Sequence, residues 1–289
     1  MKKIITTSLI AASLAAFATS ANGAALIYEP FAQDTSGGTD TALAGKAGGT
    51  GLNTWAEDGS SSDIQPEGLS YGNLQHTGGE LNMIGNNHDA YVTTTSAIGD
   101  AGLLDDGATL WFSFMYSKTN SNGGNEKGSF SFGSERIDSA YNGSNMINGG
   151  NAIGAYIAEG GTAQAASWNG DGNFSGGTGS AATANDTSYM IVGQINWGAT
   201  LSDDEMITLY FQDTSNLGTL SSSISTRSMT GVDQTQFDTI SMGTHQSLGT
   251  ITYDEIRFGA TFADVSTVPE PSAALLGALG VLALLRRRR

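Results

Sequence analysis

Hydrophobic residues in the interior of this chain occur in short runs separated by stretches rich in Gly, Asn, Ser and Asp. The clearest run, 109–116, alternates strictly: Leu110, Phe112, Phe114 and Tyr116 fall on one face and Trp111, Ser113 and Met115 on the other. Similar runs predict strands over 26–31, 80–83, 90–94, 129–132, 153–157, 189–195, 205–211, 239–242 and 251–258. No window between the two termini has a helical period over three turns. The pattern predicts an all-β chain folded as an antiparallel β-sandwich or jelly roll.

The two ends of the chain differ from this pattern. Lys2 and Lys3 precede an apolar stretch over 4–17, and small residues follow over 18–25. A basic start, a short apolar segment and a small-residue cleavage site are typical of a secretory signal peptide. We therefore predict a signal peptide over 1–23, removed by signal peptidase after Gly23, and one β-sandwich domain over 24–267.

The last 22 residues contain three successive parts: Val268-Pro269-Glu270-Pro271, an uncharged segment over 272–285, and the cluster Arg286, Arg287, Arg288 and Arg289. This order resembles the PEP-CTERM sorting signal of exported bacterial proteins. The resemblance implies a transmembrane helix over 272–285 with the arginines as its stop signal, and an exosortase-type membrane transpeptidase as partner. It also implies membrane anchoring through the C-terminus, followed by a cell-surface or extracellular location.

Composition narrows the classes of partner. The 289 residues include 28 acidic and 12 basic side chains, for a formal net charge of −16, and no cysteine. Half of the basic residues lie in the predicted end segments, so the body is more acidic still. Such a surface repels nucleic acid and attracts cations, which excludes nucleic-acid binding. The body can form no disulfide.

Several short segments point to a family for the body. In order along the chain they are Ala25-Leu-Ile-Tyr-Glu-Pro-Phe31, Gly68-Leu-Ser-Tyr-Gly72, Leu110-Trp-Phe-Ser-Phe114, Met190-Ile-Val-Gly-Gln-Ile-Asn-Trp197, Met206-Ile-Thr-Leu-Tyr210 and Tyr253-Asp-Glu-Ile-Arg-Phe-Gly259. Together they resemble exported PEP-CTERM proteins with a laminin-G-like, or concanavalin-like, jelly-roll body. The resemblance implies that the first strand pairs beside the last, which sets residues 27–31 near residues 254–258.

A search for catalytic spacing finds no support for an enzyme. Glycosidases of the concanavalin-like class carry carboxylates at alternate positions of one strand, so that both point into one cleft. Asp254 and Glu255 are adjacent, which in a regular strand sends them to opposite faces. The three histidines share no metal-ligand spacing, and no nucleophile elbow or phosphate-binding loop occurs. On this basis we expect a body without catalytic residues.

Two polar loops are candidates for a calcium site. Calcium prefers carboxylate, amide and carbonyl oxygens on adaptable backbone. The candidate ligands are Asn87 and Asp89 in the first loop and Asn169, Asp171 and Asn173 in the second. Ordinary turn usage is the competing interpretation.

One aromatic residue is a candidate for sugar binding. Trp168 lies between Ser167 and Asn169, in what the pattern indicates as a long loop region, and is expected to be exposed. An exposed indole can stack on the apolar face of a sugar, whereas packing in the sandwich is the competing interpretation.

The sequence alone favours an exported, exosortase-sorted cell-surface or extracellular-matrix protein with a non-catalytic jelly roll that binds extracellular polysaccharide, or has a purely architectural role. The alternative is a divergent glycoside hydrolase or polysaccharide lyase whose carboxylates come from separate strands.

Overall fold

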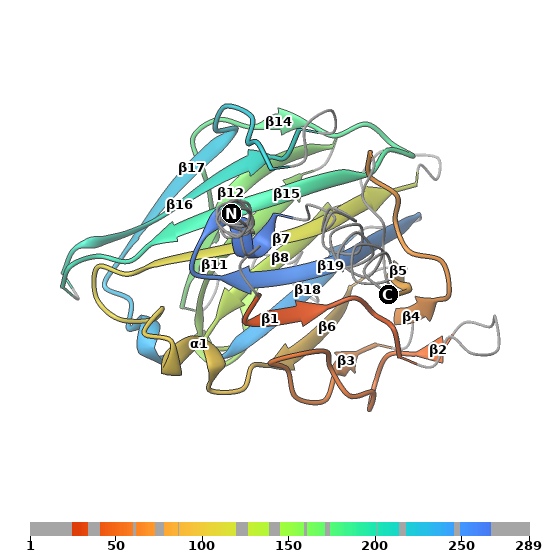
Figure 1. Ribbon diagram of the computed structural model, residues 1–289, viewed down its shortest axis with the longest axis horizontal. Helices are drawn as coiled ribbons and strands as arrows, with labels where there is room; N and C mark the ends of the chain where they lie inside the picture. Colours follow the sequence, from red (N-terminus) through yellow and green to blue (C-terminus); the bar gives the residue numbers. More distant parts are fainter. Residues whose placement is uncertain are drawn as a thin grey trace, which may run out of the picture.

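This computed structural model describes residues 25–33, 41–59, 62–72, 78–85, 87–119, 127–138, 145–158, 161–170, 174–200, 202–213, 218–245 and 249–266. Over these residues the chain is an all-β sandwich of two antiparallel sheets (Figure 1), as the sequence pattern predicted.

The nine-stranded sheet, here the front sheet, faces the viewer in Figure 1. Its strands, in spatial order, are β17 (Ser225–Thr230), β16 (Asp204–Phe211), β15 (Tyr189–Asn196), β7 (Thr109–Lys118), β19 (Thr250–Gly259), β5 (Glu80–Ile84), β4 (Ser62–Gln65) and β2 (Thr41–Ala42). The short strand β1 (Ile27–Glu29) pairs with β19 beyond the end of β5. Several neighbouring strands, such as β7 and β15 or β1 and β19, are far apart in sequence, as in a jelly roll.

The eight-stranded sheet, here the back sheet, lies behind it. Its strands are β13 (Phe174–Gly176), β12 (Thr162–Asn169), β11 (Asn151–Ala158), β8 (Lys127–Gly133), β18 (Thr239–His245), β6 (His88–Thr93) and β3 (Ala56–Asp58), with β14 (Ala181–Ala182) paired to β12. A separate hairpin joins β9 (Ile137–Asp138) and β10 (Asn145–Met146). The helices are short: α1 (Ala97–Asp100), α2 (Phe262–Val265) and the 3-10 turns η2 (Ile147–Gly149) and η3 (Gln234–Gln236).

The core lies between the sheets and is built by the alternation seen in the sequence. Leu110, Phe112, Phe114 and Tyr116 all point inward from β7 and are fully buried. Phe114 stacks on Phe130 of the back sheet with ring centroids 4.2 Å apart, which shows how closely the inner faces pack. All ten predicted strands are present, each within a few residues of its predicted bounds.

The pairing of the first strand with the last is confirmed. Ile27 lies opposite Phe258, and Glu29 lies opposite Ile256, in an antiparallel register. In Figure 1 the red strand β1 runs directly beside the blue strand β19. This pairing brings Tyr28 opposite Arg257, a contact that becomes important in the candidate active site.

The predicted membrane location is corrected. In the part of the chain that the structure describes, no helix combines the length and apolar character needed to cross a bilayer. The segment 272–285 on which that prediction was based lies outside the described residues.

Candidate active site

The most unusual backbone in the structure is a β-bulge in β19. The register of β19 with β7 pairs Asp254 with Met115 and Arg257 with Ser113. Three steps along β19 therefore match two along β7, so that β19 carries one extra residue. The positions that point into the core change from odd to even numbers at the same place. Tyr253 points into the core before the bulge, and Ile256 does so after it.

The bulge overturns the expectation that Asp254 and Glu255 point to opposite faces. Asp254 and Arg257 lie opposite Met115 and Ser113, whose side chains point away from the core. Glu255 contacts Arg257 on this same face, since the bulge turns it outward rather than into the sandwich. The expectation was wrong because strict alternation fails wherever a strand carries an inserted residue.

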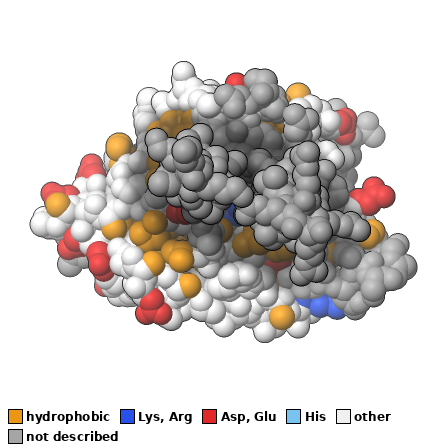
Figure 2. Space-filling view, in the orientation of Figure 1, with side chains coloured by type: hydrophobic (Ala, Val, Ile, Leu, Met, Phe, Trp, Pro, Cys, Tyr) orange, Lys and Arg blue, Asp and Glu red, His pale blue; other side chains and the backbone are white. Residues whose placement is uncertain are grey.

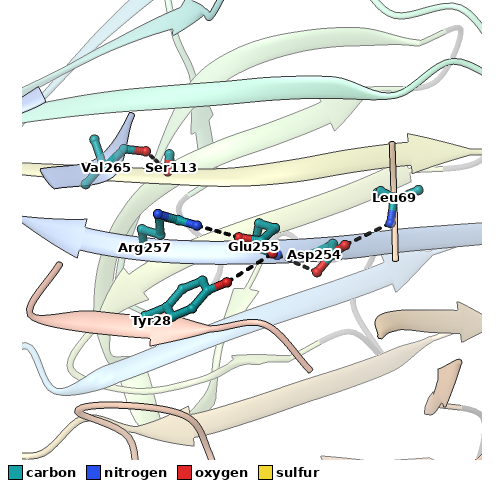
Figure 3. Close-up of polar contacts among 7 residues, drawn as sticks. All are labelled: Tyr28, Leu69, Ser113, Asp254, Glu255, Arg257 and Val265. Atoms are coloured by element: carbon teal, nitrogen blue, oxygen red, sulfur yellow. Dashed lines mark hydrogen bonds and ion pairs between the residues drawn. The ribbon is translucent and has the colours of Figure 1, made fainter. Parts of the chain in front are cut away.

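Figure 3 shows the polar contacts of Glu255 on the outer face of the front sheet. Tyr28 Oη donates a hydrogen bond to Glu255 Oε1 at 3.1 Å. Arg257 Nη2 forms an ion pair with Glu255 Oε2 at 2.6 Å, and its guanidinium lies 4.4 Å from the ring centroid of Tyr28. Glu255 is fully buried, and its two oxygens are bonded to a cation and to a hydroxyl donor.

Asp254 has a different environment. Its Oδ2 accepts a hydrogen bond from the backbone N–H of Leu69 at 2.8 Å, and its Oδ1 accepts one from the N–H of Glu255 at 2.7 Å. Burial, followed by the negative charge of Glu255, raises the pKa of Asp254 to about 9. These two effects outweigh the hydrogen bonds from the two backbone N–H groups, which lower the pKa of Asp254. Asp254 is therefore protonated at pH 7.

The site thus holds two carboxyl groups in different environments. The raised pKa of Asp254 leaves it a proton to donate, and Glu255 is ion-paired with Arg257. Neighbouring carboxyl groups in different environments are the arrangement that acid–base chemistry uses. Perturbed titration and a bulge at the same place mark this group as a candidate active site.

Both carboxyl groups are covered by surrounding residues. Asp254 and Glu255 are fully buried, whereas the side chain of Arg257 is 20% exposed and Tyr28 is half-buried. Residues of the 62–72 segment cover Asp254 through Leu69, and α2 covers β7, where Ser113 Oγ donates to the carbonyl of Val265 at 2.8 Å. Arg257 and Tyr28 are therefore the members of this group that face the solvent.

The structure does not bring the predicted calcium ligands together. Asp89 is buried and forms an ion pair with Arg136 at 2.5 Å, while the Asn87 amide oxygen contacts the ring of His245. Asn169 ends β12, with three strands between it and β6. Asp171 and Asn173 lie outside the described residues. Over the described ranges, no group of three or more acidic or histidine side chains is arranged to hold a metal ion.

Trp168 is not exposed, contrary to the sequence-based expectation. It belongs to β12, which the pattern analysis missed, and its side chain is 0% exposed. Its indole packs against Phe174 of β13 with ring centroids 5.8 Å apart, in a cluster that includes Ile137 and Met146. The ring face is already covered by protein, so it offers no platform for a sugar.

The sorting signal is not tested by the structure. Val268, Pro269, Glu270 and Pro271, together with Arg286, Arg287, Arg288 and Arg289, lie outside the described residues. Recognition of this segment by an exosortase stays a prediction.

The grouping of Asp254, Glu255, Arg257 and Tyr28 was not predicted from the sequence, although one signal was present. In β19, apolar residues occupy positions 251 and 253, then 256 and 258. This change from odd to even positions is what one inserted residue produces. The pairing of Tyr28 with Glu255 could not be read from the pattern, because it depends on the register of β1 with β19.

Comparisons with known proteins give similarities of fold. No protein-family model matches the chain, and no curated protein matches it. A protein of unknown function from Shewanella oneidensis MR-1 is similar in structure at 14% identity and a TM-score of 0.48, covering 93% of this chain and 100% of that one. An endo-β-1,4-glucuronan lyase from the fungus Trichoderma reesei has 13% identity and a TM-score of 0.45, covering 84% and 98%. An alginate lyase from Aplysia kurodai has 10% identity and a TM-score of 0.45, covering 72% and 90%.

The expectation of a body without catalytic residues is corrected. It depended on the assumption that Asp254 and Glu255 face opposite ways, and the bulge places both on one face.

Proposed function

We propose that this chain is a glycoside hydrolase that cleaves a neutral polysaccharide, with Asp254 as the general acid and Glu255 as the general base. Asp254 donates its proton to the glycosidic oxygen while the bond from that oxygen to the anomeric carbon breaks. Glu255 takes a proton from the water that adds to this carbon. Glycoside hydrolysis by a carboxyl pair requires these two roles in these protonation states.

The observation that carries the proposal is the raised pKa of Asp254 beside the ion-paired Glu255. At neutral pH a free aspartate has lost its proton and cannot act as an acid. Burial keeps the proton on Asp254, and the guanidinium of Arg257 is ion-paired with Glu255. The pair is then ready for acid and base work without a change of pH.

Tyr28 and Arg257 act as positioning residues in this proposal. Each bonds a different oxygen of Glu255, so that the carboxylate cannot rotate freely. A base held in one orientation contributes more to the reaction than a freely rotating one, because less order has to be created in the transition state.

Charge favours hydrolysis of a neutral glycan over elimination from a uronate polymer. A chain with a formal net charge of −16 repels a polyanion. A lyase must also neutralise the carboxylate of the uronate, and Arg257, the cation of this group, already pairs with Glu255. A neutral polysaccharide is not repelled by the negative charge of the chain, and it has no carboxylate that a cation must neutralise.

The test is the release of reducing ends from neutral glucans, xylans and mannans, with alginate and glucuronan as acidic comparisons. We expect the full chain to release reducing ends from a neutral polymer without forming unsaturated uronates. The isosteric variants Glu255→Gln and Asp254→Asn should each lower kcat/KM at least about 100-fold, as expected for loss of a general base or acid.

The matched control is Asp58→Asn, which changes a carboxylate that is 68% exposed and contacts Arg136 beside the back sheet. It should leave kcat/KM unchanged, and the thermal midpoints of all variants show whether they fold. Cleavage of alginate with unsaturated products, or no cleavage of any polymer by folded protein, contradicts the proposal.

A further inference from the structure

A second feature of the front sheet is a group of six side chains on its outer face. Trp111 points outward from β7, Gln194 and Asn196 from β15, and Met206, Thr208 and Tyr210 from β16. We call this group the aromatic–amide face. Figure 2 shows this side of the molecule, where orange hydrophobic side chains are visible left of centre.

The two aromatic rings of this face lie close to each other above the sheet. Trp111 and Tyr210 come from strands separated by β15, and strands are about 4.8 Å apart, so their backbones are roughly 10 Å apart. Their ring centroids are nevertheless only 6.3 Å apart, with an angle of 24° between the planes. The rings therefore reach toward each other over β15 and form one nearly parallel pair.

Amide groups lie directly beside the rings. Gln194 is opposite Trp111 in the register, and its Oε1 accepts a hydrogen bond from Tyr210 Oη at 3.5 Å. Its Nε2 donates to Asn196 Oδ1 at 3.4 Å. Both bonds are long and therefore weak, so a ligand hydroxyl can replace them at little cost.

The face is almost uncharged in a strongly acidic chain. Outward positions of β7, β15 and β16 hold no Lys or Arg, and their one acid is Asp204, at the first position of β16. The whole chain, by contrast, has 28 acidic and 12 basic side chains. A face without cations does not attract a polyanion, and one with amides and hydroxyls beside flat rings suits a ligand that is polar but neutral.

We infer that the aromatic–amide face binds a neutral glycan chain, with a pyranose ring stacked on Trp111 or Tyr210 and its hydroxyls bonded to Gln194 and Asn196. The apolar C–H face of a sugar fits a ring face, and its rim of hydroxyls fits the amides. This inference rests on the proposed function, because the glycan chain bound at this face is the one that is cleaved at Asp254 and Glu255.

The geometry of the sheet supports this connection. Gly259 pairs with Trp111 and Asp254 pairs with Met115, so the acid pair lies one strand over from Trp111 and is reached within four residues along β7. Phe262 of α2 contacts the indole of Trp111 with ring centroids 5.8 Å apart. The face and the carboxyl pair therefore lie on the same side of the sheet, with α2 packed over β7 between them.

Tryptophan fluorescence gives a direct test, because the chain has four tryptophans and the other three are buried. Trp55, Trp168 and Trp197 are at most 3% exposed, so quenching by acrylamide reports mainly on Trp111. In the Glu255→Gln background, which keeps the ligand intact, we expect a soluble neutral glycan to protect the fluorescence from quenching. Alginate should give no protection.

Variants assign the effect to this face. Trp111→Ala should weaken binding of the glycan about tenfold or more, the loss typical of an aromatic anchor. Gln194→Ala keeps both rings and should weaken binding less but measurably, which covers the case in which Trp111→Ala fails to fold. The matched control is Ile84→Ala, a side chain 46% exposed on β5 of the same sheet, which should bind as the parent does.

The outcomes separate this inference from the proposed function. Glycan binding that depends on Trp111, without any cleavage by the wild-type chain, supports the face and contradicts the catalytic proposal. Cleavage of a neutral glycan that is unaffected by Trp111→Ala and Gln194→Ala overturns the face. Absence of protection by every neutral glycan at high concentration also overturns it.

Discussion

At the scale of single residues, Glu255 shows a backbone conformation that its neighbours must stabilise. Its φ of 51° lies in the left-handed region, which costs a non-glycine residue about 1–3 kcal/mol. Its carboxylate is also buried, which is unfavourable unless the charge is compensated. The ion pair with Arg257 and the hydrogen bond from Tyr28 supply that compensation.

Removing Arg257 should therefore destabilise the fold more than removing the Tyr28 hydroxyl. Arg257→Leu leaves the Glu255 charge buried without its cation, and we expect a loss of about 3 kcal/mol in the free energy of unfolding. Tyr28→Phe removes one hydrogen bond and should cost about 1 kcal/mol. Urea unfolding of both variants measures the difference. Equal losses would show that the ion pair does not stabilise the carboxylate.

Asp254 gives a prediction for pH. Its pKa is about 9 in the folded chain, against about 3.9 for an unfolded aspartate. Between these values the unfolded chain binds fewer protons than the folded one, so this group lowers the free energy of unfolding as the pH rises from 4 to 9. Its contribution is fully present below pH 4.

Comparison with Asp254→Asn isolates this effect, because asparagine does not titrate. Urea unfolding at several pH values should show that the stability of the wild type falls more steeply toward pH 9 than that of the variant. Parallel curves would mean that Asp254 is already ionised at neutral pH, and would remove the acid from the proposed mechanism.

At the scale of elements, the strands pack so closely that one inner position requires glycine. A Cβ added at Gly193 of β15 would lie 2.1 Å from Phe112 Cζ, so the ring of Phe112 occupies the space of the missing side chain. Glycine usually weakens a strand, but here it allows the ring to lie flat against the sheet.

Gly193→Ala should accordingly destabilise the chain by about 1–3 kcal/mol, since the core must shift to admit a methyl group. The control is Gly99→Ala in α1, where an added Cβ meets nothing within 4 Å. That change should be neutral or stabilising by up to about 1 kcal/mol. Chemical unfolding of the two variants compares them, and equal effects would contradict this description of the core.

The elements also show what the sequence can predict. Strand β7 was readable because Leu110, Phe112, Phe114 and Tyr116 place a large side chain at every second position. Strand β12, with four alanines or serines among its central positions, lacks that contrast, and Trp168 was consequently misplaced in a loop. In β19 the apolar pattern was recognised as a strand, but its change of parity was not recognised as a bulge. The candidate site was missed for that reason.

At the scale of the whole molecule, Glu29 connects the start of the described chain to both sheets. It belongs to β1 of the front sheet, and its carboxylate accepts four hydrogen bonds, at 2.8–2.9 Å. The donors are the backbone N–H groups of Phe31 and Gly49 and the side chains of Gln33 and Trp55. Trp55 directly precedes β3 of the back sheet, so this one carboxylate links the two layers.

Glu29→Gln should cost about 3 kcal/mol of stability, because an amide cannot accept from all four donors and leaves buried N–H groups unsatisfied. The control is Glu57→Gln in β3, a half-buried carboxylate on the back sheet, which should cost less. Thermal and urea unfolding provide the comparison. A variant at position 29 as stable as the parent would show that the four bonds contribute little net stability.

In the proposed reaction Asp254 is the proton donor for hydrolysis of the glycan. The pH dependence of kcat/KM on a neutral polysaccharide tests this role most directly. We predict sustained activity at neutral pH that falls as the pH rises through about 9, where Asp254 loses its proton. The fall should be absent from the residual activity of Asp254→Asn. Activity that persists unchanged above pH 9, or an unchanged profile in Asp254→Asn, would contradict the account.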